Sequence, residues 1–196
     1  MVKNNRGGYC FEMNGLFSII LKQLGFKVTD LLARVIRDGA ELTAKTHQVL
    51  LVEIGDVKYL ADVGFGNKGI TAPIIFKENI EQMQFTQIYR IVNSKYGYSL
   101  QCKDDIDYLS LYTFTIEECL PVDYDMSNFY SYANPKSIFR SMKFITKPTL
   151  EGRLTMTGNQ MKILHNGQET VTVLSSDKEY IECLHKYFGI DMERVN

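Results

Sequence analysis

Three residues of the 196-residue chain have the types and the order of a nucleophilic triad: Cys10, His47 and Asp62. In such a triad the imidazole accepts the thiol proton, and the carboxylate fixes the imidazole tautomer and stabilises the imidazolium. The thiol directly follows the glycine-containing segment 7–9, at the start of a stretch with helical periodicity. Because the N-terminus of a helix is the positive end of its dipole, this position favours the thiolate form. The alternative interpretation of Cys10 is a buried structural cysteine.

The segment that begins at Cys10 is predicted to form an amphipathic helix. Its apolar residues recur at steps of three and four, the spacing of one helical face; they are Met13, Leu16, Phe17, Ile20 and Leu24. Gly25 stands just after the last of them, where a helix commonly ends in a left-handed residue. The thiol therefore lies in the first helical turn, and the apolar stripe requires a cover.

A β-hairpin is predicted to carry the other two triad residues. Two strand-like runs, 48–54 and 57–63, flank the pair Gly55-Asp56, which suits a two-residue turn. His47 directly precedes the first run, and Asp62 lies near the end of the second. The alternative interpretations are a strand-edge histidine and a strand-end cap.

The register of this hairpin decides whether the histidine and the acid meet. If the strands close tightly around the turn, Glu53 faces Lys58, and this pairing of opposite charges supports the register. His47 and Asp62 are then diagonal neighbours on one face, about 7–8 Å apart at the backbone and within side-chain reach. Their shared face weakens both alternative interpretations together.

The remaining sequence is predicted to be mostly antiparallel sheet, with helical or irregular structure over 121–142 and a last helix at the C-terminal end. That helix starts at a capping box, Ser176 to Glu179, and runs to about Phe188. Asn166-Gly167 is a strong signal for a hairpin turn. The further strands are expected at 31–36, 87–92, 98–102, 108–115, 153–157, 161–164 and 170–174.

The composition is that of an ordinary globular protein, with 45% apolar and 23% charged residues. A net charge of -1 gives no reason to expect nucleic acid or an anionic membrane as a partner. The four cysteines are scattered and distant from the three histidines, so zinc-ligand spacing is absent and metal binding is not expected. Residues 1–5 lack the apolar stretch of a signal peptide. We therefore expect a cytoplasmic protein with reduced thiols.

Three motifs occur in a familiar order: Arg6-Gly7-Gly8-Tyr9-Cys10-Phe11-Glu12-x-Asn14, Thr46-His47 and Asp62-Val63-Gly64-Phe65-Gly66. Together they resemble the arylamine N-acetyltransferase family, and the resemblance covers essentially all 196 residues. It implies an α+β fold in which a catalytic helix packs on an antiparallel β-barrel region, with an α/β lid and a cysteine-protease-like triad. The implied regions are 1–30, a remnant of the helical region with the catalytic helix; 31–120, the barrel; and 121–196, the lid with the C-terminal helix.

The same resemblance implies a ping-pong acyl transfer that depends on acetyl-coenzyme A. Cys10 would take the acetyl group, with His47 and Asp62 as partners, and an arylamine, arylhydrazine or N-hydroxyarylamine would then collect it. The resemblance also implies three substrate-binding residues. Phe65 would line the acceptor pocket, and the glycines Gly64 and Gly66 would leave room for substrate and the pantetheine arm.

One departure from the family concerns the start of the chain. The family carries several tens of residues, largely helical, before the cysteine motif, whereas nine residues precede Cys10 here. The N-terminal helical region is therefore expected to be largely absent, and Arg6 to lack its acidic partner. An uncovered catalytic helix would favour self-association or a helical partner fragment. The alternative function is a catalytically weak, partner-dependent or self-associating remnant; a thiol hydrolase or transglutaminase-like enzyme is a third.

Overall fold

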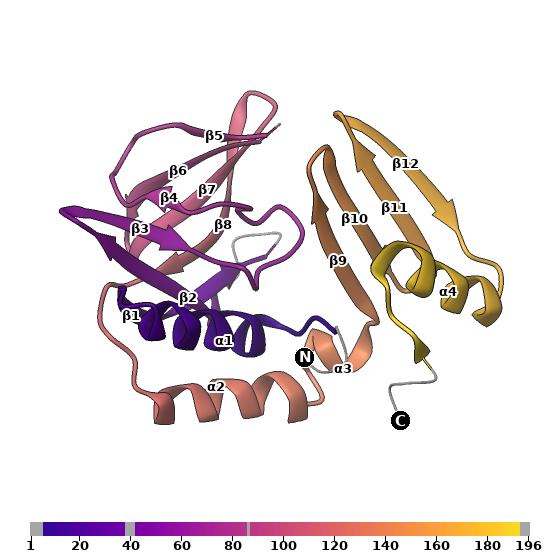
Figure 1. The fold of residues 1–196 in the computed structure, drawn as a ribbon, viewed down its shortest axis with the longest axis horizontal. Helices are drawn as coiled ribbons and strands as arrows, with labels where there is room; N and C mark the ends of the chain where they lie inside the picture. The colour runs from indigo at the N-terminus through magenta and orange to yellow at the C-terminus, as the bar shows by residue number, and fades with distance from the viewer. Residues whose placement is uncertain (1–5, 38–41, 86, 193–196) are drawn as a thin grey trace.

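The structure is a computed structural model that describes residues 6–37, 42–85 and 87–192 (Figure 1). Residues 1–5, used above to judge a signal peptide, lie outside these ranges. The chain folds as an α+β protein with two antiparallel sheets, the fold class that the sequence predicts. Across the described ranges, no helix is both long enough and apolar enough to span a membrane.

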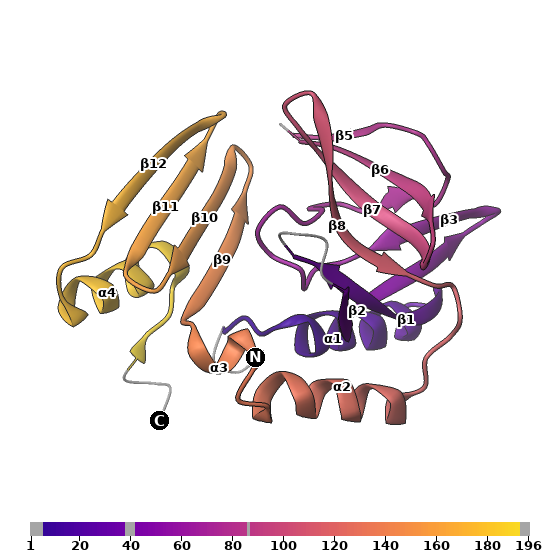
Figure 2. The same ribbon diagram turned by 180° about the vertical axis from the view of Figure 1, so that it is seen from behind.

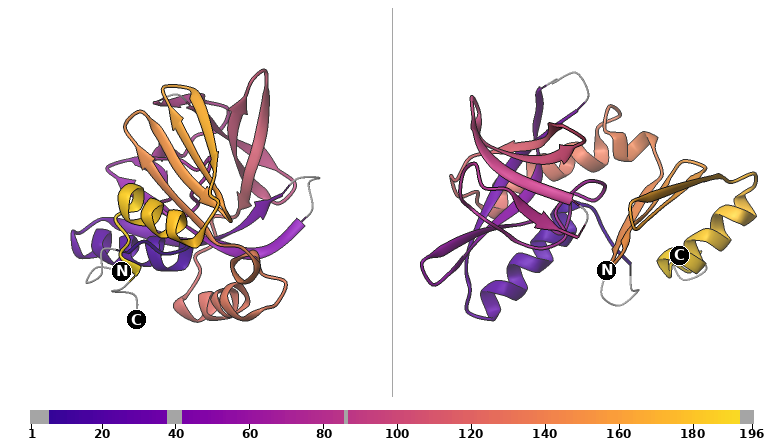
Figure 3. Two further views of the ribbon diagram at one scale, coloured as in Figure 1. Left: turned by 90° about the vertical axis from the view of Figure 1, so that its right-hand side faces the viewer. Right: turned by 90° about the horizontal axis from the view of Figure 1, so that it is seen from above.

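The larger sheet has eight strands in the order β4-β3-β2-β1-β8-β7-β6-β5 and curls into a nearly closed barrel (Figures 1 and 3). The strands are β1 Lys27–Ile36, β2 Leu42–Ile54, β3 Val57–Ala61, β4 Ile74–Ile75, β5 Gln82–Gln84, β6 Gln87–Ser94, β7 Gly97–Asp104 and β8 Asp107–Phe114. Beyond β4, Glu78 bridges to Ile91 of β6, and the backbone N–H of Asn79 donates to the Ile91 carbonyl at 2.8 Å. This contact narrows the open side of the barrel.

The predicted hairpin register is confirmed. In the β2–β3 pair Ile54 faces Val57, Glu53 faces Lys58 and Leu51 faces Leu60. Gly55, in the turn, has φ 58°, a left-handed conformation that glycine adopts without steric cost. Inward-facing residues of the barrel strands form an apolar core that excludes water; among those with at most 1% exposure are Leu31, Val49, Leu60, Ile91, Leu100 and Phe114.

Helix α1, Cys10–Gln23, begins and ends as predicted. Gly25 has φ 89°, and the N–H of Phe26 donates to the Leu21 carbonyl while that of Gly25 donates to the Lys22 carbonyl. This is the Schellman arrangement, which satisfies carbonyls that would otherwise have no partner at the helix end.

The prediction of which side of α1 is buried is wrong in part. Phe17 is only half-buried, and Ile20 and Leu24, two other members of the expected stripe, are 43% and 70% exposed. The most buried positions of α1 are Cys10 and two polar residues, Asn14 and Ser18. Polar groups can face the interior here because each finds a hydrogen-bonding partner on the barrel: Ser18 donates to Asp30, and the contacts of Asn14 are described below.

The smaller sheet has four strands in the order β12-β11-β10-β9 and lies beside the barrel (Figures 1 and 2). Its strands are β9 Phe144–Thr149, β10 Gly152–Thr157, β11 Gln160–His165 and β12 Gln168–Val173, and the helix α4 Asp177–Cys183 continues into a π-helical turn, Leu184–Phe188. Met156 and Met161 of the sheet pack with Leu184 and Phe188. Asn166 and Gly167 both have positive φ, as the predicted hairpin turn requires. Strand β9 was not predicted.

Two helices, α2 Pro121–Ala133 and α3 Ile138–Ser141, connect the sheets. Ser127 Oγ of α2 donates to the Lys45 carbonyl of β2 at 2.7 Å, and Tyr9, just before α1, hydrogen bonds through its hydroxyl to Asn128. Helix α2 therefore contacts both chain segments that lead into the predicted triad. The division at residues 30 and 120 remains a prediction.

Candidate active site

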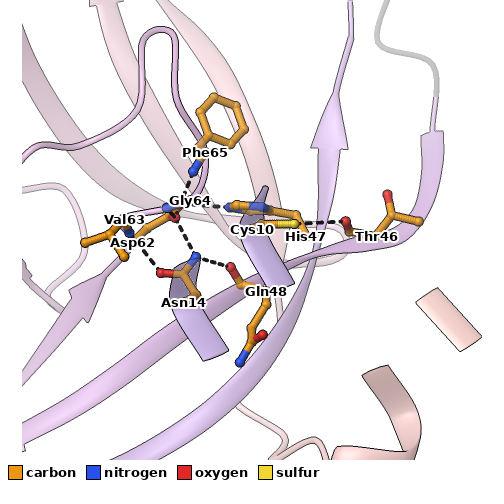
Figure 4. Close-up of polar contacts among 9 residues, drawn as sticks. All are labelled: Cys10, Asn14, Thr46, His47, Gln48, Asp62, Val63, Gly64 and Phe65. Carbon is orange, nitrogen blue, oxygen red and sulfur yellow. Dashed lines mark hydrogen bonds and ion pairs between the residues drawn. The ribbon is translucent and has the colours of Figure 1, made fainter. Parts of the chain in front are cut away.

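The N-terminus of α1 brings the Cys10 thiol to the edge of the barrel (Figure 4). Cys10 is the first residue of α1, and its side chain is buried, with 4% exposure. The Tyr9 carbonyl accepts from the N–H groups of Glu12 and Met13, and the Tyr9 N–H donates to the Glu12 carboxylate at 3.2 Å. Sγ of Cys10 lies 3.5 Å from the Thr46 carbonyl, so the residue before His47 in β2 is a hydrogen-bond partner of the thiol.

His47 and Asp62 form the pair that the hairpin register predicts. His47 Nε2 lies 2.7 Å from Asp62 Oδ2, and both side chains are buried. Burial opposes a charged imidazole, but the carboxylate outweighs it and, with smaller contributions from Cys10, raises the pKa of His47 to about 10. Burial likewise opposes ionisation of Asp62, yet the positive charge of His47 and the hydrogen bonds hold the pKa of this carboxyl below its ordinary value. The pair is therefore an imidazolium and a carboxylate at neutral pH.

Asn14, one turn after Cys10, connects the thiol-bearing helix to the acid. Its Nδ2 donates to Asp62 Oδ1 at 2.8 Å and to the Gln48 carbonyl at 2.7 Å, and its Oδ1 accepts from the Val63 N–H at 2.8 Å. The side chain is fully buried, with 0% exposure. All its donor and acceptor groups are thus in use, and they join α1, the strand that carries His47 and the loop after Asp62.

The loop after Asp62 folds around the carboxylate. Oδ1 also accepts from the N–H groups of Gly64 at 2.9 Å and Phe65 at 3.1 Å. With Asn14, three donors stabilise one oxygen while the other oxygen faces His47 (Figure 4). The carboxylate is therefore held rigidly in the orientation that fixes the imidazole.

Aromatic rings enclose the imidazole on the barrel side. The ring centroid of His47 lies 5.2 Å from that of Phe65 and 5.1 Å from that of Tyr112, and the last two are 5.3 Å apart. Tyr112 is fully buried, and its hydroxyl has no hydrogen-bond partner among the residues that the structure describes. Phe65, predicted from the resemblance to line an acceptor pocket, thus lies against the imidazole.

The two glycines of the loop have a packing role that the sequence did not predict. A Cβ on Gly64 would lie 2.6 Å from Cys10 Cα, and a Cβ on Gly66 would lie 2.6 Å from Thr146 Cγ2. Gly64 therefore allows the loop to approach the start of α1, and Gly66, with φ 69°, allows it to approach β9. Room for substrate at these glycines stays a prediction.

The structure brings together all the predicted triad residues, and it adds one that the sequence argument missed. Asn14 stands in the motif 6–14, which by itself assigns no role to this residue. The signal was available, because residues four apart lie on the same helical face, so a polar residue four positions after a candidate nucleophile points toward the same site. Arg6, in contrast, is exposed and makes no ion pair with the described carboxylates. Nor do the described residues include a group of three or more side chains that could hold a metal ion.

A buried imidazole–carboxylate pair beside a thiol at a helix N-terminus is the arrangement that cysteine-dependent transferases and hydrolases use. Within this class of enzymes, the family model described as N-acetyltransferase matches residues 1–196. The arylamine N-acetyltransferase / N-hydroxyarylamine O-acetyltransferase of Salmonella typhimurium is 36% identical over 194 residues, 97% of this chain and 69% of that protein. The arylamine N-acetyltransferase of Escherichia coli is 37% identical, over 85% of this chain and 60% of its own length. The chain belongs to the arylamine N-acetyltransferase family, as the sequence motifs predicted.

Solved structures agree in fold. The Salmonella typhimurium enzyme superposes with a TM-score of 0.91 at 32% identity, covering 97% of this chain and 72% of that one. The Mycobacterium marinum arylamine N-acetyltransferase in complex with CoA gives a TM-score of 0.93 at 29% identity, covering 98% and 73%. A Bacillus cereus arylamine N-acetyltransferase described as having a Cys-His-Glu catalytic triad gives a TM-score of 0.86 at 28% identity, covering 96% of this chain and 76% of that one. The chain thus spans between 60% and 76% of the length of these four relatives.

Proposed function

We propose that this chain transfers an acetyl group from acetyl-coenzyme A to an arylamine, arylhydrazine or N-hydroxyarylamine through an acetyl-cysteine at Cys10. The observation that carries the proposal is the 2.7 Å contact between His47 Nε2 and Asp62 Oδ2 beside that thiol, in a member of this family. The alternative of a weak, partner-dependent remnant is not favoured, because Cys10, His47 and Asp62 lie together within this one chain.

In the first half-reaction, the Cys10 thiolate attacks the thioester carbonyl of acetyl-coenzyme A. A new carbon–sulfur bond forms, the tetrahedral oxyanion collapses, and the coenzyme leaves as a thiol with the proton that the His47 imidazolium gives up. Exchange of one thioester for another is nearly isoenergetic, so the acetyl group can wait on the enzyme. The N–H of Cys10, which has no acceptor within the helix because it is in the first turn, is the proposed oxyanion donor.

In the second half-reaction, the neutral amine attacks the acetyl-cysteine. His47, now neutral, takes the proton from the attacking nitrogen, and the Cys10 thiolate leaves with the electron pair of the broken carbon–sulfur bond. Asp62 stabilises the imidazolium that forms again and holds the ring in place. The thiolate–imidazolium pair is thereby restored. Phe65 stands beside the imidazole, where an aromatic amine would have to approach.

The experiment is intact-mass analysis of the purified chain after brief exposure to acetyl-coenzyme A. We expect one added acetyl group on the wild type and on Cys119→Ala, a matched control at a partly buried cysteine, and none on Cys10→Ala. Addition of an arylamine should remove the group from the enzyme and yield the acetylated amine. Acetylation that persists in Cys10→Ala, or an acetyl-enzyme that no arylamine discharges, would contradict the proposal.

A further inference from the structure

The turn that follows Phe65 is held by the four-stranded sheet as well as by the barrel. The turn closes when the Gly69 N–H donates to the Gly66 carbonyl at 2.7 Å. At its start, Gly66 lies so close to Thr146 of β9 that a Cβ would be 2.6 Å from Thr146 Cγ2. At its end, Nη2 of Arg153 in β10 donates to the Gly69 carbonyl at 3.1 Å. Two neighbouring strands of the second sheet therefore contact the two ends of one short turn.

Gly69 transmits this contact to the aromatic ring at the active site. A Cβ added to Gly69 would lie 2.9 Å from Phe65 Cβ and 3.0 Å from Phe65 Cδ1, so its backbone already packs against that side chain. From the barrel side, the Tyr89 hydroxyl lies 3.0 Å from the same Gly69 carbonyl. Phe65 in turn meets the His47 ring edge-on, with centroids 5.2 Å apart. A continuous series of contacts thus runs from Arg153 to the imidazole.

The chemistry of Arg153 fits a positioning role better than a surface role. The guanidinium is half-buried, forms no salt bridge with any carboxylate in the described ranges, and donates to a neutral backbone carbonyl. Burial lowers its pKa from the usual value, as expected for a cation withdrawn from water. A hydrogen bond from an ionised donor is about twice as strong as one between neutral groups. This bond joins residues 84 positions apart.

We propose that Arg153 is a positioning residue for the acceptor half-reaction. Through Gly69 it fixes the place of Phe65 beside His47, and so determines which aromatic amines the acetylated enzyme can use. The second sheet therefore takes part in acceptor selection without touching the reacting atoms. The inference rests on the proposed function, because it assigns the ring of Phe65 to the wall that the amine meets.

Three variants separate positioning from general stability. Arg153→Met keeps the length of an unbranched side chain but removes the donor, and Arg153→Lys keeps the charge but loses the planar fork. The matched control is Arg90→Met, because Arg90 is another half-buried arginine, stacked 3.4 Å over the Tyr108 ring and bonded to Gln101 on the barrel. Its loss should cost stability without reaching the turn at Gly69.

The two half-reactions are measured separately, with aniline as a compact acceptor and 2-aminofluorene as an extended one. In Arg153→Met we expect Cys10 to be acetylated at close to the wild-type rate. The acceptor step should slow by roughly 10- to 100-fold, with a changed ratio between the two amines. The rate of the acceptor step in Arg153→Lys should lie between those of the wild type and Arg153→Met. Arg90→Met should keep the wild-type ratio between the two amines. An unchanged ratio, or an equal loss in both half-reactions, would overturn the proposal.

Amide hydrogen exchange gives a readout that does not depend on activity. Exchange in the peptide covering residues 64–70 should accelerate in Arg153→Met and stay unchanged in Arg90→Met, since the turn at Gly69 loses its donor from β10 in the first variant alone. Unaltered exchange in Arg153→Met would refute the positioning contact. If the wild type transfers no acetyl group while exchange accelerates as expected, then the proposed function fails and the assignment of Arg153 to acceptor selection falls with it, whereas the contact itself stands.

Discussion

Replacement of Asn14 by aspartate tests the buried hydrogen bonds that join the thiol-bearing helix to the acid. The substitution hardly changes shape, but it exchanges an NH2 donor for an oxygen. That oxygen would face Asp62 Oδ1, 2.8 Å from Nδ2 in the wild type, and the Gln48 carbonyl, 2.7 Å from it. Both neighbours are acceptors, so the variant carboxyl conflicts with each of them unless it is protonated.

The magnitude follows from two separate costs. With the two carboxylate charge centres about 4 Å apart and an effective dielectric constant of about 20, the repulsion is about 4 kcal/mol, or about 3 pKa units. The repulsion thus raises the pKa of the variant carboxyl well above the usual value of about 3.9. In addition, the single proton of a neutral carboxyl cannot serve both acceptors, and leaving the buried Gln48 carbonyl unsatisfied costs about 1–3 kcal/mol at any pH.

These costs have different pH dependences. Because the variant carboxyl has a higher pKa in the folded than in the unfolded chain, the folded state binds more protons between the two values, and its stability falls as pH rises through that window. We expect the free energy of unfolding of Asn14→Asp, measured in urea, to be lower than that of the wild type by about 1–3 kcal/mol near pH 4. Near pH 7 the gap should widen by up to about 4 kcal/mol.

The control is Asn134→Asp, since Asn134 Oδ1 accepts from the Lys136 N–H at 2.9 Å at the surface, and an aspartate oxygen can accept in the same way. Its free energy of unfolding should stay within about 1 kcal/mol of the wild type at both pH values, the most that a carboxylate at the C-terminal end of α2 should cost. If the difference in free energy of unfolding between the wild type and Asn14→Asp is the same at pH 4 and pH 7, then the new carboxyl does not face Asp62. The network around Asn14 would then be incorrectly described.

Three further predictions test the packing, the charge state and the surface of the site. Gly64→Ala should lower stability by about 1–3 kcal/mol and slow acylation, because its Cβ would lie 2.6 Å from Cys10 Cα. A Cβ on Gly7 would meet nothing within 4 Å, so the control Gly7→Ala should leave the free energy of unfolding in urea unchanged. Equal effects of the two substitutions would contradict this packing. The raised pKa of His47 adds stability that is fully present below about pH 6.5 and is lost as pH rises through about 10. The stability difference between wild type and His47→Gln should therefore shrink over that range, and a constant difference would argue against the charged pair. Leu24 of α1 is 70% exposed, and Ile19 and Ile20 of the same helix are 57% and 43% exposed. We therefore expect the 196-residue chain to associate at micromolar concentration in sedimentation velocity, and a monomer throughout would refute this.

The triad could be predicted because its geometry depends on local rules. The two-residue turn at Gly55-Asp56 determines the β2–β3 register, and the register alone places His47 and Asp62 on one face within reach of each other. The start of α1 at Cys10 follows from helical periodicity and a terminal glycine, which are equally local signals. No distant contact is needed for either inference.

What the sequence did not reveal depends on contacts between distant segments. Strand β9 contains Pro148, which lowers the expectation of a strand, yet β9 pairs with β10 along its length and lies at one edge of its sheet, where a missing N–H is tolerated. The contact of Arg153 with Gly69 joins two sheets across 84 positions, and no periodicity indicates it. The packing of Gly64 on Cys10 likewise becomes visible only when the loop and the helix are seen together.

The orientation of α1 shows how buried hydrogen bonds can outweigh hydrophobic patterning. If burial of apolar area alone decided the packing, the side with Ile20 and Leu24 would face the barrel, since each fully buried large side chain stabilises by roughly 1.5–3 kcal/mol. Instead the buried side carries Cys10, Asn14 and Ser18, and hydrogen bonds to the barrel satisfy both polar side chains. Such bonds add little net stability but are costly to leave unmade, so they determine the rotation of the helix about its axis. That rotation is what aims the thiol at the imidazole, and exposed apolar surface on the opposite side is its physical consequence.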